Sequence, residues 1–344
     1  MAPAGANNYA ANLNYLALRG YISGTPQDQL TNNSIRKINS HTKSDIGFNR
    51  TSIIFILMVM IIGVGSCKPP FEYGDRSFFV RSADNSFYEI QANLVDQNDD
   101  AQVFVQLGES VSKAQVELIL EEFSANILPS VTDTYGPSSD LDNNGKIILM
   151  LHDIDDNYSG PGSSYIAGYF DPTDLLISRF SNGGEILYID TNPALQDFTG
   201  MLSTIAHELQ HLVNHVEWNI IDSPAPGSYV RIETWLNEAL SLSAEEVYTG
   251  SRLTDRIGYY YGDPNYRILN GNGFLSWDAT EDYSSVYLFF HWLRAHAGEA
   301  TIYSEIFNSN FSDYQAVIEQ LPNYAELSSL YDIDAEKAWD NLFN

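Results

Sequence analysis

The segment STIAHELQHLVNH, residues 203–215, contains three of the chain's seven histidines and the pattern His-Glu-x-x-His. Each residue of an α-helix advances by about 100°, so His207 and His211 share one face and Glu208 lies beside it. Two imidazoles on one face can bind one metal ion, and the glutamate can reach a water molecule without being a ligand. The opposite side carries an apolar stripe made of Leu202, Ile205, Leu209, Leu212 and Val216. The face with the histidines therefore either lines a cleft or is a solvated polar face.

A third metal ligand is expected from a second helix, TWLNEALSLSAEE at residues 234–246. Glu238 lies opposite the apolar stripe of that helix, which consists of Leu236, Leu240 and Val247. Glu238 taken alone would be better explained as a solvated surface residue, but with His-Glu-x-x-His upstream we favour a ligand: two helices packed at an angle would bring His207, His211 and Glu238 around one ion. Three protein ligands and one open position are typical of a catalytic zinc ion. His215 lies about 12 Å along the helix from His207, too far to share the ion, and we assign it to the surface or to a supporting position.

Four segments together resemble the hyicolysin family of neutral zinc metallopeptidases, which are of the gluzincin type: TIAHELQHLVN, WLNEALSLSAEE, DLDNNGKIILML and YSSVYLFFHWL. The resemblance extends over roughly residues 100–295 and is absent from the first 67 residues. It implies a zincin-like fold and one zinc ion held by His207, His211 and Glu238, the last within Asn237-Glu238-Ala239. It does not indicate which substrate is cleaved.

The chemistry expected of such a site is hydrolysis of a peptide bond by a metal-activated water. Glu208 would accept the proton of that water and later pass it to the leaving amine. Related gluzincins stabilise the oxyanion with a tyrosine or histidine of the helical half. The resemblance points first to Tyr283 in this role, with Tyr287, His291 and the cluster 259–261 as alternatives. Aromatic packing is the competing interpretation for each tyrosine, because the chain has 22 of them.

Around these segments the sequence predicts an α+β fold, with a mostly antiparallel sheet first and helices later. Alternating apolar and polar residues predict antiparallel strands within 77–108, and apolar runs predict further strands at 146–151 and 185–190. Helical spacing predicts helices at 112–128, 194–216, 230–248 and 283–297. Pro129 is expected to end the first of these helices. The β-rich part is placed at 68–192 and the helical part at 193–344.

The strand at 185–190 precedes the His-Glu-x-x-His helix, as the substrate-pairing edge strand does in zincins. We therefore expect it to bind an extended peptide substrate by strand addition.

The first 67 residues are interpreted as an N-terminal extension and export signal outside the fold. Their apolar run IIFILMVMIIGV, residues 53–64, is shorter than the roughly twenty residues that cross a bilayer, but it suits a signal peptide. It is followed by VGSC, which resembles the lipobox of bacterial lipoproteins and makes Cys67 the residue that carries the lipid. About fifty polar residues precede the apolar run, which is more than such signals contain. The alternative interpretation of the run and Cys67 is a buried strand with a core cysteine. We expect a protein attached to the bacterial cell envelope through this lipid only.

Composition narrows the classes of partner. The net charge is −28 and the isoelectric point is near 4.3, which argues against nucleic acid as a partner because phosphates require a basic surface. With 44% hydrophobic residues the chain can bury a large core, and its single cysteine excludes an intrachain disulfide.

A possible calcium site is indicated by DLDNNG, residues 140–145, which matches the start of a calcium loop at Asp140, Asp142 and Asn144. The complete motif would require a glutamate at its twelfth position, where this chain has Leu151. A tight turn before a strand is an equally good interpretation.

The sequence as a whole predicts an envelope-anchored zinc endopeptidase that acts on peptides or proteins. The alternative is a surface lipoprotein that binds a protein partner and keeps a vestigial metal site. Only the enzyme requires Glu208.

Overall fold

The computed structural model describes residues 75–343, apart from residues 162, 216–231, 265–272 and 278–280. Cys67 and the apolar run before it therefore lie outside the described residues. Within the described part, no helix combines the length and apolar character needed to cross a membrane.

A six-stranded sheet forms the first half of the described chain, in the order β1-β2-β3-β4-β6-β5. Its first three strands are β1 (Asp75–Arg81), β2 (Phe87–Gln97) and β3 (Ala101–Gln106), and each pairs antiparallel with the next. The alternating pattern predicted this meander, because short turns join strands whose apolar residues face one way.

The remaining strands make the sheet mixed, but most of its pairs are antiparallel as predicted: three of the five strand pairs in the described sheet are antiparallel and two are parallel. They are β4 (Ile147–His152), β5 (Gly168–Phe170) and β6 (Ile186–Asp190). The β3–β4 and β4–β6 pairs are parallel, and the β5–β6 pair is antiparallel. Parallel neighbours need a long crossover, and here the helices between β3 and β4 supply one.

The prediction that the strand at 185–190 lies at the edge of the sheet was wrong. β6 pairs with β4 on one side and with β5 on the other, so both of its backbone edges are occupied. The edge strand next to the helical half is β5, a segment of three residues that was too short for its pattern to reveal it.

The helix after β3 does not end at Pro129, contrary to the prediction. It starts as α4 (Lys113–Glu122), with Ser112 and Gln115 forming a capping box. It passes through a π-helical turn at Phe123–Ile127 and continues as α5 (Leu128–Tyr135). Proline lacks an N–H group, and here it occupies the first turn of α5, where that donor is least needed.

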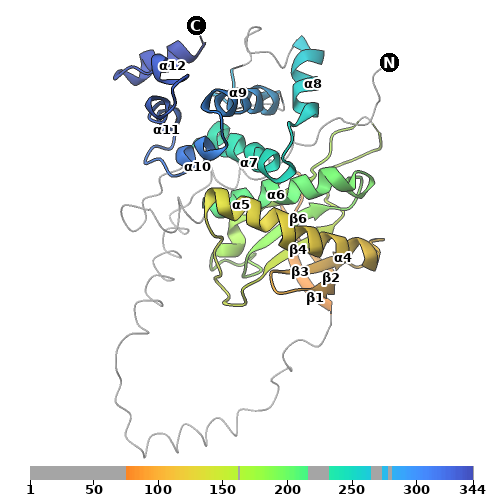
Figure 1. The fold of residues 1–344 in the computed structure, drawn as a ribbon. Coiled ribbons are helices and arrows are strands. Elements are labelled where there is room, and N and C mark those ends of the chain that lie inside the picture. Colours follow the sequence, from red (N-terminus) through yellow and green to blue (C-terminus); the bar gives the residue numbers. More distant parts are fainter. Residues whose placement is uncertain (1–74, 162, 216–231, 265–272, 278–280, 344) are drawn as a thin grey trace, which may run out of the picture.

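Helices dominate the second half of the described chain (Figure 1). They are α6 (Phe198–His215), α7 (Thr234–Thr249), α8 (Thr254–Gly262), α9 (Asp282–Ala297), α10 (Thr301–Phe307), α11 (Gln315–Ile318) and α12 (Ala335–Phe343). α4, α5 and α6 lie against the sheet, and α7, α9 and the last helices stack beyond α6 (Figure 1). The fold is therefore α+β, as the order of elements in the sequence predicted.

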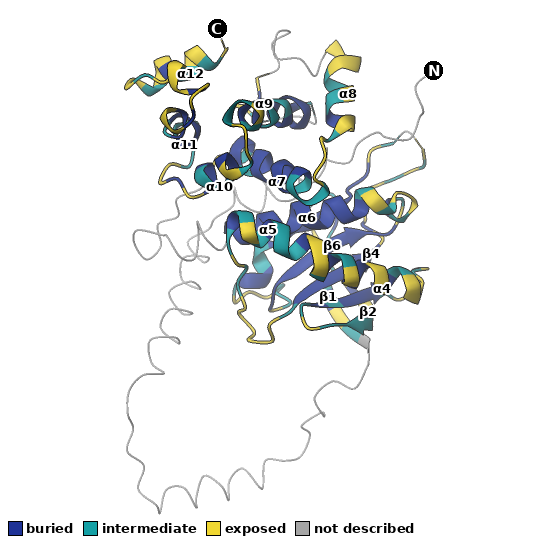
Figure 2. Ribbon diagram, viewed as in Figure 1, coloured by how far each residue is buried: buried dark blue, intermediate teal, exposed yellow. Residues whose placement is uncertain are grey.

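The principal apolar core is continuous across both halves. It joins one face of the sheet to α4–α7, α9 and α10, with residues such as Leu149, Ile205 and Trp235 fully buried. A second, smaller core covers the other face of the sheet and includes Met150 and Tyr188. Figure 2 shows that α6, which lies between the sheet and α7, is buried along most of its length. By contrast, α4, α8 and α12 have exposed sides. The helix with the His-Glu-x-x-His pattern thus lies at the centre of the molecule.

Candidate metal centre

α6 presents its histidines to another helix and not to water. Its apolar stripe is buried as expected, with Ile205, Leu209 and Leu212 each 0% exposed. The opposite face is covered as well, because α7 packs along it: His207 is 1% and His211 6% exposed. The alternative of a solvated polar face is therefore excluded.

Three side chains from α6 and α7 converge at this contact. His207, His211 and Glu238 offer ligand atoms that all lie within 4.8 Å of one another. Nε2 of His207 is 3.3 Å from Oε2 of Glu238, and Nε2 of His211 is 3.5 Å from Oε1. Two ligands bound tetrahedrally at zinc distances are separated by about 3.3 Å. The spacing of the donors therefore matches what a tetrahedral zinc ion requires.

The polar atoms of this group also fit a metal ion. Neither Nε2 atom has a hydrogen-bond partner of sound geometry among the described residues, although both are buried. Burial would lower the pKa of His207, but the nearby carboxylates of Glu238, 3.3 Å from Nε2, and of Glu245 outweigh it and raise the pKa to about 10. Burial would likewise raise the pKa of Glu238, but the neighbouring His211 and His207 lower it to about 2. The surroundings thus favour a positive charge between these side chains, which a divalent cation would supply.

Further contacts from α7 orient both imidazoles. Nδ1 of His207 lies 2.8 Å from Oε1 of Glu245, to which its N–H donates. Nδ1 of His211 lies 3.0 Å from the hydroxyl of Ser241. That hydroxyl donates its only proton to Gln210 Oε1 at 2.5 Å or to a backbone carbonyl, so it accepts from His211. With each Nδ1 engaged in this way, Nε2 is the nitrogen through which each imidazole would ligate a metal ion, and on His207 the ion would replace a proton.

Glu245 and Ser241 received no role in the sequence analysis. They do share the helical face of Glu238, with Ser241 three and Glu245 seven residues after it. Their placement indicates a supporting role only once the position of α6 is known, because each of these two side chains bonds to a histidine about thirty to forty residues away.

Glu208 is placed beside the three converging side chains and is not one of them. It is 1% exposed, and its Oε1 has no hydrogen-bond partner among the described residues. Burial raises its pKa to about 7, because the opposing effect of His207 and His211 is smaller. A carboxyl group with a pKa near neutrality can both accept and donate a proton at physiological pH.

Tyr283 of α9 reaches the same place. It is 1% exposed, and burial together with the neighbouring Glu238, to which it hydrogen-bonds, raises its pKa well above the usual range. The guanidinium carbon of Arg256 lies 5.4 Å from the centre of its ring. The structure thus brings a phenol from α9 and a cation from α8 to the candidate metal centre.

Two other candidates for the oxyanion role, Tyr287 and His291, bond to residues that are not among the three converging donors. Tyr287 accepts a hydrogen bond from the backbone N–H of Leu253 at 2.7 Å, and His291 contacts Glu246 at 3.0 Å.

His215 packs its ring against Phe170 of β5, with centroids 5.7 Å apart, consistent with its exclusion from the ligand set.

The segment DLDNNG forms a tight turn, and only part of it gathers as the calcium interpretation expected. The side chain of Asn144 bonds within the turn itself: its amide N–H donates to Asp142 at 2.6 Å, and its oxygen accepts from the backbone N–H of Lys146 at 2.6 Å. Asp140 and Asp142 instead approach a carboxylate that the sequence analysis did not single out, Glu185, immediately before β6.

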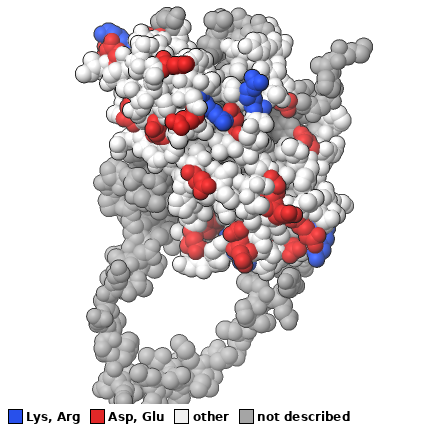
Figure 3. Space-filling model, in the orientation of Figure 1, with Lys and Arg blue, Asp and Glu red and all other residues white. Residues whose placement is uncertain are grey.

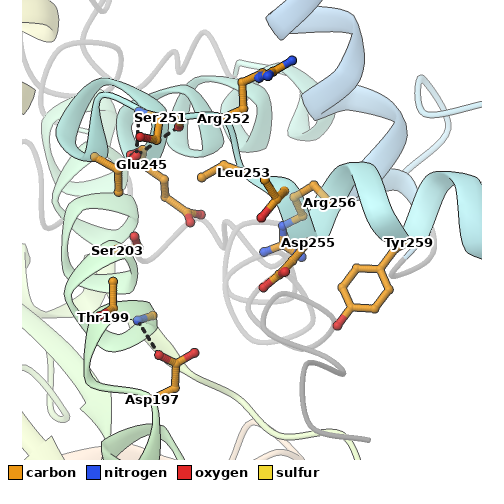
Figure 4. Close-up of a pocket in the computed structure, with 13 residues that line it drawn as sticks. Asp197, Thr199, Ser203, Glu245, Ser251, Arg252, Leu253, Asp255, Arg256 and Tyr259 are labelled. Atoms are coloured by element: carbon orange, nitrogen blue, oxygen red, sulfur yellow. Dashed lines mark hydrogen bonds between the residues drawn. The ribbon is translucent and has the colours of Figure 1, made fainter. Parts of the chain in front are cut away.

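A pocket of about 440 Å³ adjoins the centre (Figure 4). Its walls come from Asp197 and the first turns of α6, the end of α7 and the start of α8. The charged lining residues are Asp197, Glu245, Arg252, Asp255 and Arg256. Glu245 points into the pocket from α7 in Figure 4, and the same side chain contacts His207. The side chain of Glu245 would therefore lie between a molecule bound in this pocket and the three converging donors.

Comparison with known proteins gives one informative similarity. No family model matches the chain. It is 32% identical over 223 residues to the neutral metalloprotease ShpI of Staphylococcus hyicus, a match that covers 62% of this chain. The same match covers 49% of that protein, so the chain spans about half the length of this relative. The buried His-His-Glu group thus occurs in a chain that is similar, over 62% of its length, to a neutral metalloprotease.

Proposed function

We propose that this protein is a zinc-dependent endopeptidase with its active site between α6 and α7. His207, His211 and Glu238 would hold the zinc ion, and Glu208 would transfer the proton. The single observation that carries the proposal is the convergence of three buried donors at tetrahedral spacing beside a buried carboxyl group that is not one of them. The similarity to a neutral metalloprotease supports the same chemistry.

The zinc ion, when bound, supplies Lewis-acid polarisation of a peptide carbonyl and of a water molecule. The chain's own residues do the rest. Glu208 would accept a proton from the attacking water at Oε1, which has no hydrogen-bond partner in the described part of the chain, and would return the proton to the leaving amine. Glu245 and Ser241 keep the two imidazoles in the tautomer that ligates.

Substrate would approach along β5 and the pocket beside Glu245. β5 is the edge strand nearest α6, and an extended peptide can add to such an edge by backbone hydrogen bonds. The pocket would then receive one substrate side chain. Tyr283, with its hydroxyl near Glu238, is the residue we propose to stabilise the oxyanion.

Anchoring to the bacterial cell envelope through a lipid on Cys67 completes the proposal. It rests on the apolar run and the VGSC segment of the sequence alone.

The decisive experiment substitutes Glu208→Gln. The variant is expected to retain one zinc ion per chain, because Glu208 is not among the converging donors, and to lose at least 10³-fold in casein cleavage. Glu238→Gln serves as the contrasting variant, since it is expected to lose zinc as well as activity. If folded wild-type protein bound no zinc and cleaved nothing, the rival function of a partner-binding surface lipoprotein would be favoured. If Glu208→Gln cleaved casein at the wild-type rate, the proposed mechanism would be wrong.

A further inference from the structure

A second group of carboxylates lies at the amino ends of β4 and β6. It consists of Asp140 and Asp142, in the turn before β4, and Glu185, immediately before β6. Each offers one oxygen, and these oxygens lie within 4.8 Å of one another. The two aspartates are exposed and the glutamate is buried. None of the three belongs to the proposed zinc centre, so the group needs an explanation of its own.

Glu185 is an unusual residue to find at this position. Its side chain is 1% exposed. Oε1 accepts hydrogen bonds from the hydroxyl of Ser139 at 2.5 Å and from the N–H of Leu141 at 2.9 Å, which fixes the carboxylate against the turn. Oε2 is buried and has no hydrogen-bond partner among the described residues. A buried carboxylate oxygen without a partner costs free energy unless a cation compensates it.

The turn holds the two aspartates against Glu185. The N–H of Gly145 donates to Oδ1 of Asp140 at 3.0 Å, which folds the loop back on itself. Oδ2 of Asp142 lies 3.3 Å from the position that a Cβ at Gly184 would occupy, so Asp142 rests directly on the backbone next to Glu185. The carboxylates therefore face one another from two segments about forty residues apart.

The basic side chains nearby are not bonded to this group, although the charge of Arg76 interacts with that of Asp142 through space. Lys146 follows the turn but directs its ammonium group to Gln97 and to the carbonyl of Asn98. Arg76 donates to the carbonyl of Asn182 at 2.7 Å. Among the described residues, the ion pairs of Lys and Arg involve other acids. Three carboxylates thus gather without a cationic side chain bonded to them.

We infer that Asp140, Asp142 and Glu185 bind a calcium ion. The donors are all hard oxygens, which suit calcium and not zinc. Ligands on opposite sides of a calcium ion are about 4.8 Å apart, so the spacing of this group accommodates one ion. The exposed aspartates leave room for the water molecules that complete six to eight ligands. Glu185 supplies from a distant strand the carboxylate that the sequence motif lacks at Leu151.

The expected consequence is structural. A bound ion would tie the turn before β4 to the start of β6, and it would stabilise the parallel strands that lead toward α6. Because the ion binds the folded chain only, it should raise the melting temperature in proportion to the logarithm of its concentration.

The test uses the zinc-loaded full chain and titrates it with CaCl₂ and, separately, with MgCl₂. Calorimetry should detect one calcium ion bound per chain, and 5 mM CaCl₂ should raise Tm by about 4 °C or more. Asp142→Asn and Glu185→Gln should each reduce the calcium affinity at least tenfold and abolish the rise in Tm. The two variants complement each other, because Asp142 is exposed and its substitution spares the core.

A matched control removes two exposed acids of α4, with Glu117→Gln and Glu121→Gln in one chain. It lowers the acidic charge without touching the turn, and it should keep the full response to calcium. The inference is overturned by any of three results: no calcium heat in the wild type, an equal response to magnesium, or an undiminished response in Asp142→Asn. None of these results depends on peptidase activity, so the test is independent of the proposed function.

Discussion

At the scale of single residues, the candidate metal centre depends on which nitrogen each histidine presents. Glu245 accepts the Nδ1–H of His207, and Ser241 accepts that of His211. A neutral imidazole whose Nδ1 carries the proton has its lone pair on Nε2, and both Nε2 atoms face Glu238. The supporting residues therefore decide the tautomer, and the tautomer decides whether the site can bind a metal.

The first prediction at this scale concerns Glu245→Gln. Loss of the carboxylate should weaken zinc affinity by about 10- to 100-fold, because His207 loses its charged acceptor. Competition with a chelator of known zinc affinity measures the change. Glu122→Gln is the matched control, since Glu122 also contacts α7, through Tyr248 at 3.0 Å, but touches neither histidine. Equal zinc affinity in Glu245→Gln and the wild type would show that Glu245 does not orient the ligand.

At the scale of elements, β5 and α6 approach each other through a glycine. A Cβ at Gly168 would lie 2.8 Å from the carbonyl oxygen of Tyr188 and 2.8 Å from Cγ2 of Thr204. The first of these atoms belongs to the backbone of β6 and cannot move aside. Because Gly168 has no Cβ, it allows the edge strand β5 to pack closely against both β6 and α6, the helix of the candidate site.

Gly168→Ala should accordingly lower the free energy of unfolding by about 1–3 kcal/mol, because the added methyl group forces the strands apart. Urea denaturation gives this value. Gly258→Ala in α8 is the control: a Cβ there meets nothing within 4 Å, and alanine favours helix, so this change should be neutral or slightly stabilising. A Gly168→Ala chain as stable as the wild type would mean that the strand and helix separate without cost.

At the scale of the whole molecule, the chain combines an acidic surface with buried groups that titrate abnormally. Acidic side chains predominate over basic ones on the face in Figure 3, in keeping with the net charge of −28. Inside, His152 ends β4 with 0% exposure, and neither ring nitrogen has a hydrogen-bond partner among the described residues. Burial lowers its pKa to about 3. The folded state therefore excludes a proton that the unfolded chain binds below about pH 6.5.

This difference predicts a loss of stability as pH falls. Between about pH 6.5 and pH 3 the unfolded state binds one more proton than the folded state, so His152 destabilises the fold by up to about 1.4 kcal/mol per pH unit. His152→Phe keeps an aromatic ring edge-on against the stacked rings of Tyr169 and Tyr188 and removes the titration. Its stability should fall less steeply than that of the wild type in this range, as measured by denaturation at a series of pH values. Identical pH profiles would assign the acid sensitivity to other groups.

Attachment to the envelope is tested at the same scale. Cys67→Ser should move the protein from the membrane fraction to the soluble fraction, because the lipid on Cys67 is the proposed anchor. Fractionation followed by immunodetection measures this. Ser66→Ala, which keeps the cysteine and a small residue before it, is the control. Membrane association unchanged in Cys67→Ser would refute the lipid anchor.

The sequence by itself determined the helices at 194–216 and 230–248, to within a few residues, and the faces on which their acids and histidines lie. It did so because helical periodicity is a local property, fixed by residues three or four positions apart. The same reasoning selected His207, His211 and Glu238 as a set and excluded His215.

Only the tertiary structure decided what covers those faces and what completes each site. Burial of the histidines depends on α7 packing against α6, and Glu245, Ser241 and Glu185 act across separations of about thirty residues or more. The parallel strands, the three-residue edge strand β5 and the helix that continues past Pro129 were likewise missed. Each of them depends on backbone pairing or packing with distant residues, and no pattern within one segment encodes such contacts.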